Sequence, residues 1–169
     1  MARAPRPRLA LDHNFPTPIL NALRTYIVDV DLVTLREIDD RLPTLDDRAL
    51  VIALRQRRFA GLVTNNYKML KNPRELAAIM ATKMTAFAIE GVGDDPLRAT
   101  GALLLDLPGA LRRMDTRRAQ VFWMRPRNPQ PEDPAVLFER IAKHQQRTVA
   151  DLFAEVEVSR AELRRAVLD

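Results

Sequence analysis

The sequence predicts an α/β domain, a three-layer sandwich built on a mainly parallel five-stranded sheet, with a helical C-terminal extension. Two patterns carry this prediction. Short apolar runs without polar alternation, such as the one that begins at Leu9, are typical of parallel strands covered on both faces. Helix-like patterns follow these runs, and such alternation predicts a parallel sheet with right-handed crossovers.

The domain is expected over residues 1–124, with five strands. The first begins at residue 8 and ends at Asp12 and Asn14, and the others cover residues 28–35, 59–64, 85–90 and 120–124. Pro16 and Pro18 suit the opening of a helix that runs to about residue 26. Thr44 is the expected N-cap of a second helix, with an acidic residue three places later, ending near residue 57. Further helices are expected from Asn72 and over residues 96–113.

The character of the chain changes after residue 124. Residues 125–134 carry four prolines and no aliphatic side chain, so they are expected to form an extended, poorly packed linker. Residues 135–169 read as a helical extension, in which Ser159 and Glu162 form a capping box for the last helix. The apolar faces of these helices need a partner, which is either the same chain or a second copy in a homodimer.

Composition limits the classes of function. With no cysteine and two histidines, the chain has no thiol nucleophile and no thiolate zinc site, so any metal would be held by oxygen. No run approaches a membrane span, and the N-terminus lacks the apolar core of a secretory signal, so a cytoplasmic protein without membrane contact is expected. The net charge of +5 permits a polyanionic partner such as RNA, although basic residues at helix ends are commonly solvated.

Polar oxygens gather where the expected strands end. Such sheets bind ligands beyond the carboxyl ends of their strands, where carboxylate and amide oxygens suit Mg²⁺ or Mn²⁺. Acidic pairs also stand at a helix start (Asp46 and Asp47) and after the fourth strand (Asp94 and Asp95). Turn and capping chemistry would explain each of these positions singly. The residues at the ends of the first and third strands are Asp12, Asn14, Thr64, Asn65 and Asn66.

Three short motifs resemble those of the compact PIN-like domains, relatives of the VapC-type toxin ribonucleases. The motifs are Leu11-Asp-His-Asn-Phe-Pro16, the Asp46-Asp47 pair, and the strand exit Val63-Thr-Asn-Asn-Tyr-Lys68. The resemblance covers residues 8–124 and implies RNA phosphodiester cleavage with Mg²⁺ or Mn²⁺, with water as the nucleophile.

The same resemblance implies roles for individual residues. It makes Asp12 and Asp47 the catalytic metal ligands, with Asp46, Asn14 and Asn66 as weaker ligands. Thr64, Asn65 and Lys68 would contact the substrate, and an antitoxin or another protein is the implied partner. At the third motif, however, Asn66 and Lys68 stand where the family pattern has acids.

Two other functions fit parts of the pattern. One is a PIN-like scaffold with a weakened metal site that binds RNA or a protein without cleaving. The other is an aspartate-nucleophile phosphatase of the haloacid dehalogenase type, with Asp12 as the nucleophile and Thr64 and Asp94 as the later elements. In that second case Asn14 stands where the phosphatase motif has a second acid. The short spacing between Thr64 and Asp94 also leaves little room for the core of that family's fold.

Overall fold

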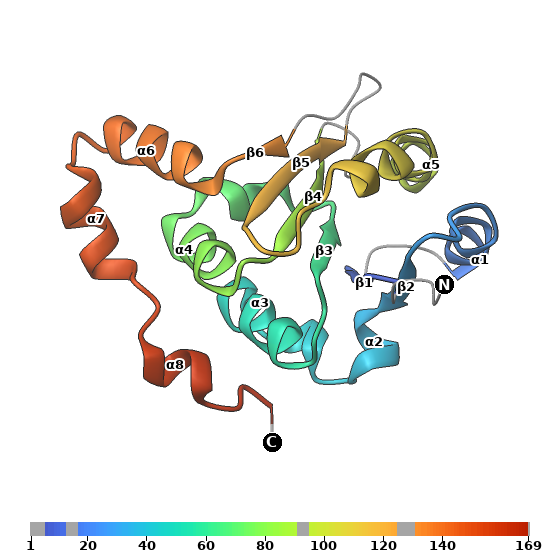
Figure 1. Ribbon diagram of the computed structural model, residues 1–169, viewed down its shortest axis with the longest axis horizontal. Coiled ribbons are helices and arrows are strands. Elements are labelled where there is room, and N and C mark those ends of the chain that lie inside the picture. The colour runs from blue at the N-terminus through green and yellow to red at the C-terminus, as the bar shows by residue number, and fades with distance from the viewer. Residues whose placement is uncertain (1–5, 13–16, 91–94, 125–130, 169) are drawn as a thin grey trace.

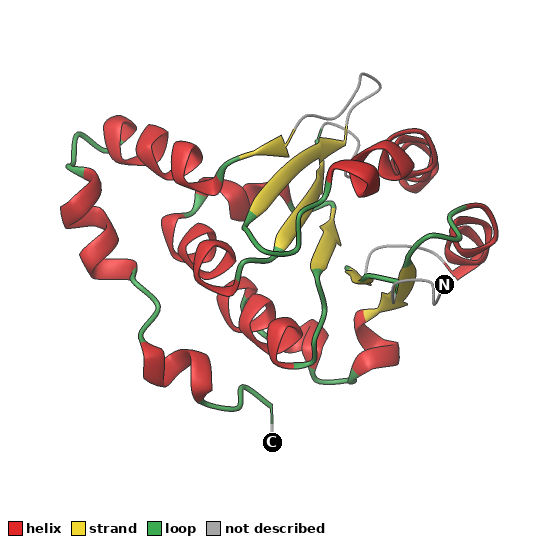
Figure 2. Cartoon of the chain, in the orientation of Figure 1, coloured by secondary structure: helices red, strands yellow, loops and turns green. Residues whose placement is uncertain are grey.

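The computed structural model describes residues 6–12, 17–90, 95–124 and 131–168 (Figures 1 and 2). Asn14, Asp94 and the linker residues 125–130 lie outside this part of the chain. The described residues form an α/β fold with a mostly parallel sheet. No described helix combines the length and the hydropathy that a membrane span needs.

Five parallel strands form the sheet, as the sequence predicts, and a sixth joins them. In space the strands follow the order β2-β1-β3-β4-β5-β6. Each of the five parallel strands is four or five residues long, and all except the edge strand β2 are mostly buried. Their bounds are β1 (Arg8–Leu11), β2 (Asp31–Thr34), β3 (Gly61–Thr64), β4 (Thr85–Ile89) and β5 (Gln120–Met124).

The sixth strand was not expected, because it lies in the proline-rich segment. β6 (Pro131–Glu132) pairs antiparallel with Val121 and Phe122 of β5. The Nε1 of Trp123 in β5 donates a hydrogen bond to the Glu132 carboxylate at 2.7 Å. Residues 131–132 are therefore extended, as predicted, but are held against the sheet. Two residues with a proline have no apolar period from which a strand could be predicted.

Helices cover both faces of the sheet, and side chains alternate between the faces along each strand. Leu9 and Leu11 face α1 (Thr17–Tyr26) and α5 (Pro96–Arg113), whereas Ala10 faces the opposite side. The opposite face packs against α3 (Asp47–Gln56), α4 (Pro73–Thr82) and α6 (Pro134–His144). Both buried clusters thus meet at a sheet that is apolar on its two sides.

The crossovers do not all share one hand. α1 leads from β1 outward to β2, and α5 leads from β4 to β5 in the opposite direction along the sheet. Both helices lie on the same face, so these two crossovers have opposite hands, and the prediction of uniformly right-handed crossovers is wrong for one of them. Near β4 and β5, the face of the sheet opposite α1 is covered by α4 and α6. α5 therefore packs on the face of α1, beside that helix (Figure 1).

Shorter helices complete the chain. α2 (Leu35–Ile38) begins with a capping box between Thr34 and Glu37, and a hydrogen bond from Arg24, with the two Thr34 bonds, lowers the pKa of Glu37 to about 2. The 3₁₀-helices η1 and η2 lie at Leu42–Thr44 and Tyr67–Lys71. The predicted cap at Thr44 is wrong. Thr44 belongs to η1, and Asp46 caps α3 through a hydrogen bond from the Ala49 N–H at 2.8 Å.

The C-terminal extension folds back on its own chain. Phe138 of α6 is 1% exposed and packs edge-to-face against Phe153 of α7 (Val149–Val156), with ring centroids 5.5 Å apart. Both α6 and α7 contact α4. The predicted N-cap of the last helix is confirmed, since Ser159 accepts the Glu162 N–H at the start of α8 (Arg160–Arg164). The Glu162 carboxylate does not complete the predicted capping box, because it accepts hydrogen bonds from Arg48 instead. A homodimer through these helices stays a prediction.

Arg48 fastens this extension to the domain. The side chain is 8% exposed, and its guanidinium donates two hydrogen bonds to the Glu162 carboxylate, at 2.6 and 2.8 Å. It also donates to the carbonyls of Arg74, Val156 and Glu157. Hydrogen bonding to Glu162 is the main cause that raises the pKa of Arg48, so this contact favours the charged guanidinium. The buried guanidinium of Arg48 therefore connects α3, the start of α4 and the extension.

Gly61 allows β3 and β4 to approach closely. A Cβ atom at this position would lie 2.5 Å from the backbone oxygen of Thr85 and 3.0 Å from a methyl carbon of Leu9. Because the nearest atom is backbone, it cannot rotate away. We expect Gly61→Ala to destabilise the fold by about 2 kcal/mol, measured by urea denaturation. Gly101→Ala is the matched control, since no atom beyond its chain neighbours and its own helix backbone lies within 4 Å of its Cβ position. An equal loss in both variants would contradict the steric explanation.

Candidate functional site

The expected site lies where the strand order of the sheet reverses. The chain runs from β1 to β2 on one side and returns to place β3 on the other side of β1. In open α/β sheets, ligands bind beyond the carboxyl ends of the strands at such a switch point. Asp12 directly follows β1, and Thr64 is the last residue of β3. Both residues therefore stand at the position where this architecture presents ligands.

Asp12 and Thr64 form a buried pair. Oδ2 of Asp12 accepts a hydrogen bond from the Thr64 hydroxyl at 2.8 Å, and the two residues are 8% and 1% exposed. The backbone N–H of Asp12 donates to the carbonyl of Val63 at 3.0 Å, which continues the pairing of β1 with β3. Because both its backbone and its side chain are held, the Asp12 carboxylate has a defined orientation.

A second pair links this carboxylate to α3. The Asn66 Nδ2 donates to Oδ2 of Asp47 at 3.0 Å, and the Asn66 backbone N–H donates to the Thr64 hydroxyl at 2.9 Å. Asp47 is the first residue of α3 and is half-buried. Continuous hydrogen bonds thus run from Asp12 through Thr64 and Asn66 to Asp47. The structure brings together four of the residues that the sequence singled out.

Asn65 presents a buried oxygen without a partner. The residue is 9% exposed, and its Oδ1 accepts no hydrogen bond within the described part of the chain. A buried carbonyl oxygen without a donor is costly, and native structures generally satisfy such groups with protein, water or ligand. Substrate contact by Asn65 remains a prediction, and this oxygen is the feature that favours it.

Glu75 belongs to this region, although the sequence pattern indicated only a helix start there. It lies in the first turn of α4, is 9% exposed, and its buried Oε2 has no hydrogen-bond partner in the described residues. Burial is the main cause that raises the pKa of Glu75, and the negative charges of Asp47 and Asp46 add to it. Glu75 thus adds a buried acidic group to the surroundings of Asp47.

The other expected residues have separate positions. Asp46 is exposed, and one of its oxygens caps α3. Lys68 is exposed in η2. Asp95 caps α5 by accepting the N–H groups of Leu97 and Arg98, both at 3.0 Å, which fits the capping alternative. Metal binding by Asp46 and substrate binding by Thr64 and Lys68 stay predictions.

The described side chains fit a cation that is shared with a phosphate better than one enclosed by protein alone. In residues 6–12, 17–90, 95–124 and 131–168, no three His, Cys, Asp or Glu side chains are grouped closely enough to hold a metal ion. The linked groups are the carboxylates of Asp12 and Asp47 and the neutral amide and hydroxyl of Asn66 and Thr64. Mg²⁺ commonly takes one or two protein carboxylates and completes its octahedron with water and substrate phosphate. This oxygen donor set therefore suits Mg²⁺ or Mn²⁺.

Comparisons of the chain with protein-family models, curated proteins and solved structures gave no match.

The raised pKa of Glu75 leads to a prediction on stability. Because the folded state holds the Glu75 proton more tightly than the unfolded chain, stability falls as the pH rises above the ordinary value of 4.5 and through the folded pKa. We expect Glu75→Gln, which cannot ionise, to be more stable than the wild type at pH 7. The two proteins should become equally stable below about pH 4. Urea denaturation at both pH values measures this, and a less stable variant at pH 7 would contradict the assignment of an unpaired buried charge.

Proposed function

We propose that the chain is a PIN-like domain that cleaves RNA phosphodiester bonds with the help of Mg²⁺ or Mn²⁺. One observation carries the proposal: the hydrogen-bonded series from Asp12 through Thr64 and Asn66 to Asp47, located at the switch point of the sheet. The membership in the PIN-like family rests on the three sequence motifs that supply these residues, and the helices on both faces of the sheet agree with a three-layer arrangement.

The buried position of the polar residues favours a functional role over simple turn chemistry. A turn or a helix cap uses a carboxylate at the surface, as Asp95 and Asp133 do in this chain. Asp12 and Thr64 are instead buried at the end of a central strand. Burial of polar groups costs free energy even when they are paired. A site that must orient a carboxylate toward a ligand gives a reason for that cost.

Each residue has a definite task in the proposed reaction. Asp12 and Asp47 would hold the cation, Thr64 orients Asp12, and Asn66 connects Thr64 to Asp47. A divalent cation held there would supply positive charge for a phosphate oxygen and would make a water molecule more acidic. Lys68 would bind the phosphate backbone outside the buried pair, and the Oδ1 of Asn65 would accept a hydrogen bond from an RNA donor such as a 2′-hydroxyl. Glu75 contributes a third negative charge near Asp47.

The test is manganese-dependent cleavage of a panel of structured and single-stranded RNAs by the wild type and by Asp12→Ala, purified identically. Cleavage that the variant lacks supports the proposal. Equal cleavage by both proteins would contradict it, because the activity would then not depend on the buried carboxylate. Circular dichroism of both proteins verifies that they are folded.

A second function is favoured by one specific feature of the site. Asn66 and Lys68 bring no negative charge to the third motif, and the grouped side chains in the described residues include no set of three acids. A scaffold that binds RNA, an antitoxin or another protein fits this weakened site. RNA binding that weakens with added salt, without cleavage in the presence of Mn²⁺, would establish this function instead.

A further inference from the structure

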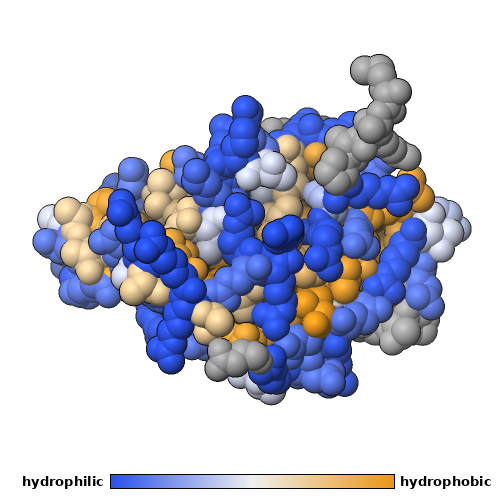
Figure 3. Space-filling view, turned by 60° about the horizontal axis from the view of Figure 1, so that its bottom comes forward, coloured by the Kyte–Doolittle hydropathy of each residue, from blue (hydrophilic) through white to orange (hydrophobic). Residues whose placement is uncertain are grey.

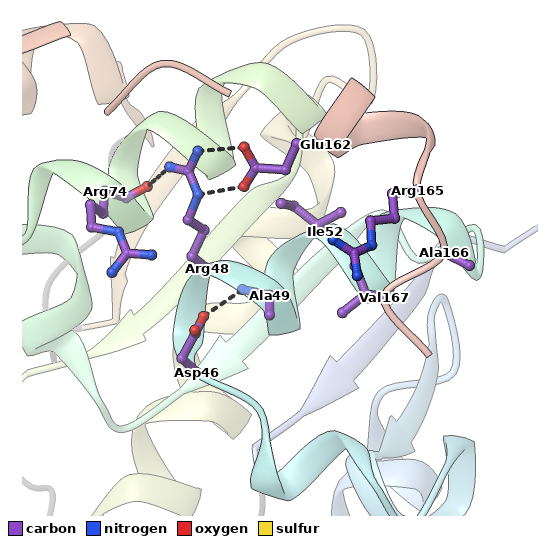
Figure 4. Close-up of a pocket in the computed structure, with 9 residues that line it drawn as sticks. All are labelled: Asp46, Arg48, Ala49, Ile52, Arg74, Glu162, Arg165, Ala166 and Val167. Carbon is purple, nitrogen blue, oxygen red and sulfur yellow. Dashed lines mark hydrogen bonds and ion pairs between the residues drawn. The ribbon is translucent and has the colours of Figure 1, made fainter. Parts of the chain in front are cut away.

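A pocket lies at the starts of α3 and α4, which also carry two residues of the proposed cleavage site. It has a volume of about 390 Å³ and is formed by the first two turns of α3, by Arg74 at the start of α4, and by Glu162 and residues 165–167 of the C-terminal extension (Figure 4). Ligand pockets commonly have volumes of about 300 to 1,000 Å³, so one nucleotide can fit. The two sites share the same helix starts: Asp47 and Glu75 belong to the site, while their chain neighbours Asp46, Arg48 and Arg74 line the pocket.

The charges in the pocket favour an anion. The charge of Arg48 is neutralised by Glu162, with which it forms a bidentate ion pair. Arg74 and Arg165 are exposed, and neither forms a side-chain ion pair within the described part of the chain. Asp46 opposes them with a single carboxylate, one oxygen of which caps α3. The lining therefore keeps an excess of positive charge that arginine can use for phosphate.

The remaining walls are apolar. Ile52 and Ala49 of α3 lie on one side of the pocket and Val167 of the extension on the other, with Arg165 extending between them and Ala166 at the outer edge (Figure 4). Arg74 lies at the opposite end. Figure 3, in which the lower side of Figure 1 comes forward, shows hydrophilic groups over most of this face with hydrophobic groups between them. An apolar wall next to an arginine plane is the environment in which proteins stack an unpaired RNA base.

We propose that this pocket binds one nucleotide of a single-stranded RNA, with its phosphate on Arg74 and its base between Arg165 and the apolar wall of Ala49 and Val167. This proposal rests on the proposed ribonuclease function, because the pocket-lining Asp46 and Arg48 are the chain neighbours of Asp47. The C-terminal extension thereby forms half of a substrate site. Sequence-based domain boundaries alone would place it outside the nuclease.

The test uses the full chain in a buffer with a chelator, so that binding is measured without cleavage. Isothermal titration calorimetry compares adenosine 5′-monophosphate, adenosine, inorganic phosphate and an adenylate tetranucleotide. We expect the monophosphate to bind more tightly than adenosine or phosphate alone, and the tetranucleotide to bind more tightly still. Arg74→Gln and Arg165→Gln should each weaken binding of the monophosphate about tenfold. The control is Arg160→Gln. Arg160 is exposed at the start of α8, the helix that Arg165 caps at its C-terminus, and it does not line the pocket.

Separate outcomes identify which proposal fails. No binding of the monophosphate, or binding that neither arginine variant weakens, would overturn the pocket. Tetranucleotide binding weaker than that of the monophosphate would overturn RNA as its ligand. Asp12→Ala should bind the monophosphate as the wild type does. If the arginine variants lose binding but the wild type never cleaves RNA, the pocket is supported and the nuclease function is contradicted. If the wild type cleaves RNA but the arginine variants bind the monophosphate normally, the nuclease function is supported and the pocket is contradicted.

Discussion

Asp12→Asn should lower the rate of manganese-dependent RNA cleavage by at least about 100-fold. The substitution keeps the size of the side chain and one oxygen that can accept from Thr64, but it removes half of the charge that Asp12 and Asp47 offer to a cation. Loss of a residue that only orients a metal ligand typically costs about 10- to 100-fold, so loss of a ligand should cost at least as much. Initial rates on the best RNA substrate, at saturating Mn²⁺, measure the effect.

Two further variants distinguish loss of the Asp12 charge from a general disruption of the structure. Thr64→Val, which removes the hydroxyl between Asp12 and Asn66, should cost about 10- to 100-fold, because the carboxylate remains but loses its orientation. Asp133→Asn should have the wild-type rate. Asp133 is an exposed N-cap that follows β6, at the opposite edge of the sheet, and asparagine caps helices equally well. A wild-type rate for Asp12→Asn would rule out this carboxylate as a metal ligand.

Phe138→Ala should destabilise the whole protein by about 3 to 5 kcal/mol. The ring is almost fully buried and belongs to the same apolar cluster as residues of α3, α4 and the sheet. Removing it opens a cavity between the extension and the domain rather than within the extension alone. Val136→Ala on the same helix should cost less than about 1 kcal/mol, because Val136 is 43% exposed.

The shape of the unfolding curve tests the same point. If residues 134–168 are part of one core, wild type and Phe138→Ala should each unfold in a single transition in urea, observed both by circular dichroism and by fluorescence of Trp123. A separate early transition of helical signal, or a loss below 1 kcal/mol for Phe138→Ala, would show that the extension is an independent appendage.

Local signals in the sequence were sufficient to locate most elements. α5 and β5 have the predicted bounds, and the helix start at Asn72 is correct. Proline at the first helical position and a polar residue before it fix such starts through contacts a few residues apart. The start of α3 was misplaced by two residues because Thr44 and Asp46 are both good caps, and the turn of η1 decides between them.

Features that depend on long-range contacts could not be predicted from the sequence. The antiparallel β6, and the position of α5 on the face of α1, follow from how α4 and α6 fill the opposite face. These choices depend on contacts between segments far apart in the chain, which periodicity does not record. The same limit applies to the extension, whose attachment depends on the buried contact between Arg48 and Glu162.

The candidate site was predictable in part. Asp12, Thr64 and Asn66 were recognised because they follow apolar runs, and parallel strands end at one edge. The role of Thr64 as a bridge and the burial of Glu75 were not, because both result from the approach of β1 to β3 and of α4 to α3. A glutamate in the first turn of a helix is ordinarily a surface residue that interacts with the helix dipole, so its sequence position alone gave no signal.

The most direct test of the proposed site is the binding of Mn²⁺ itself, followed by electron paramagnetic resonance as the ion is titrated into the wild type, Asp12→Asn and Asp133→Asn. If the carboxyl edge of the sheet holds the cation, wild type and Asp133→Asn should bind about one ion per chain with equal affinity, and Asp12→Asn should bind it at least about tenfold more weakly. Equal affinity in all three proteins, or no binding by the wild type at millimolar Mn²⁺, would contradict a metal site at Asp12.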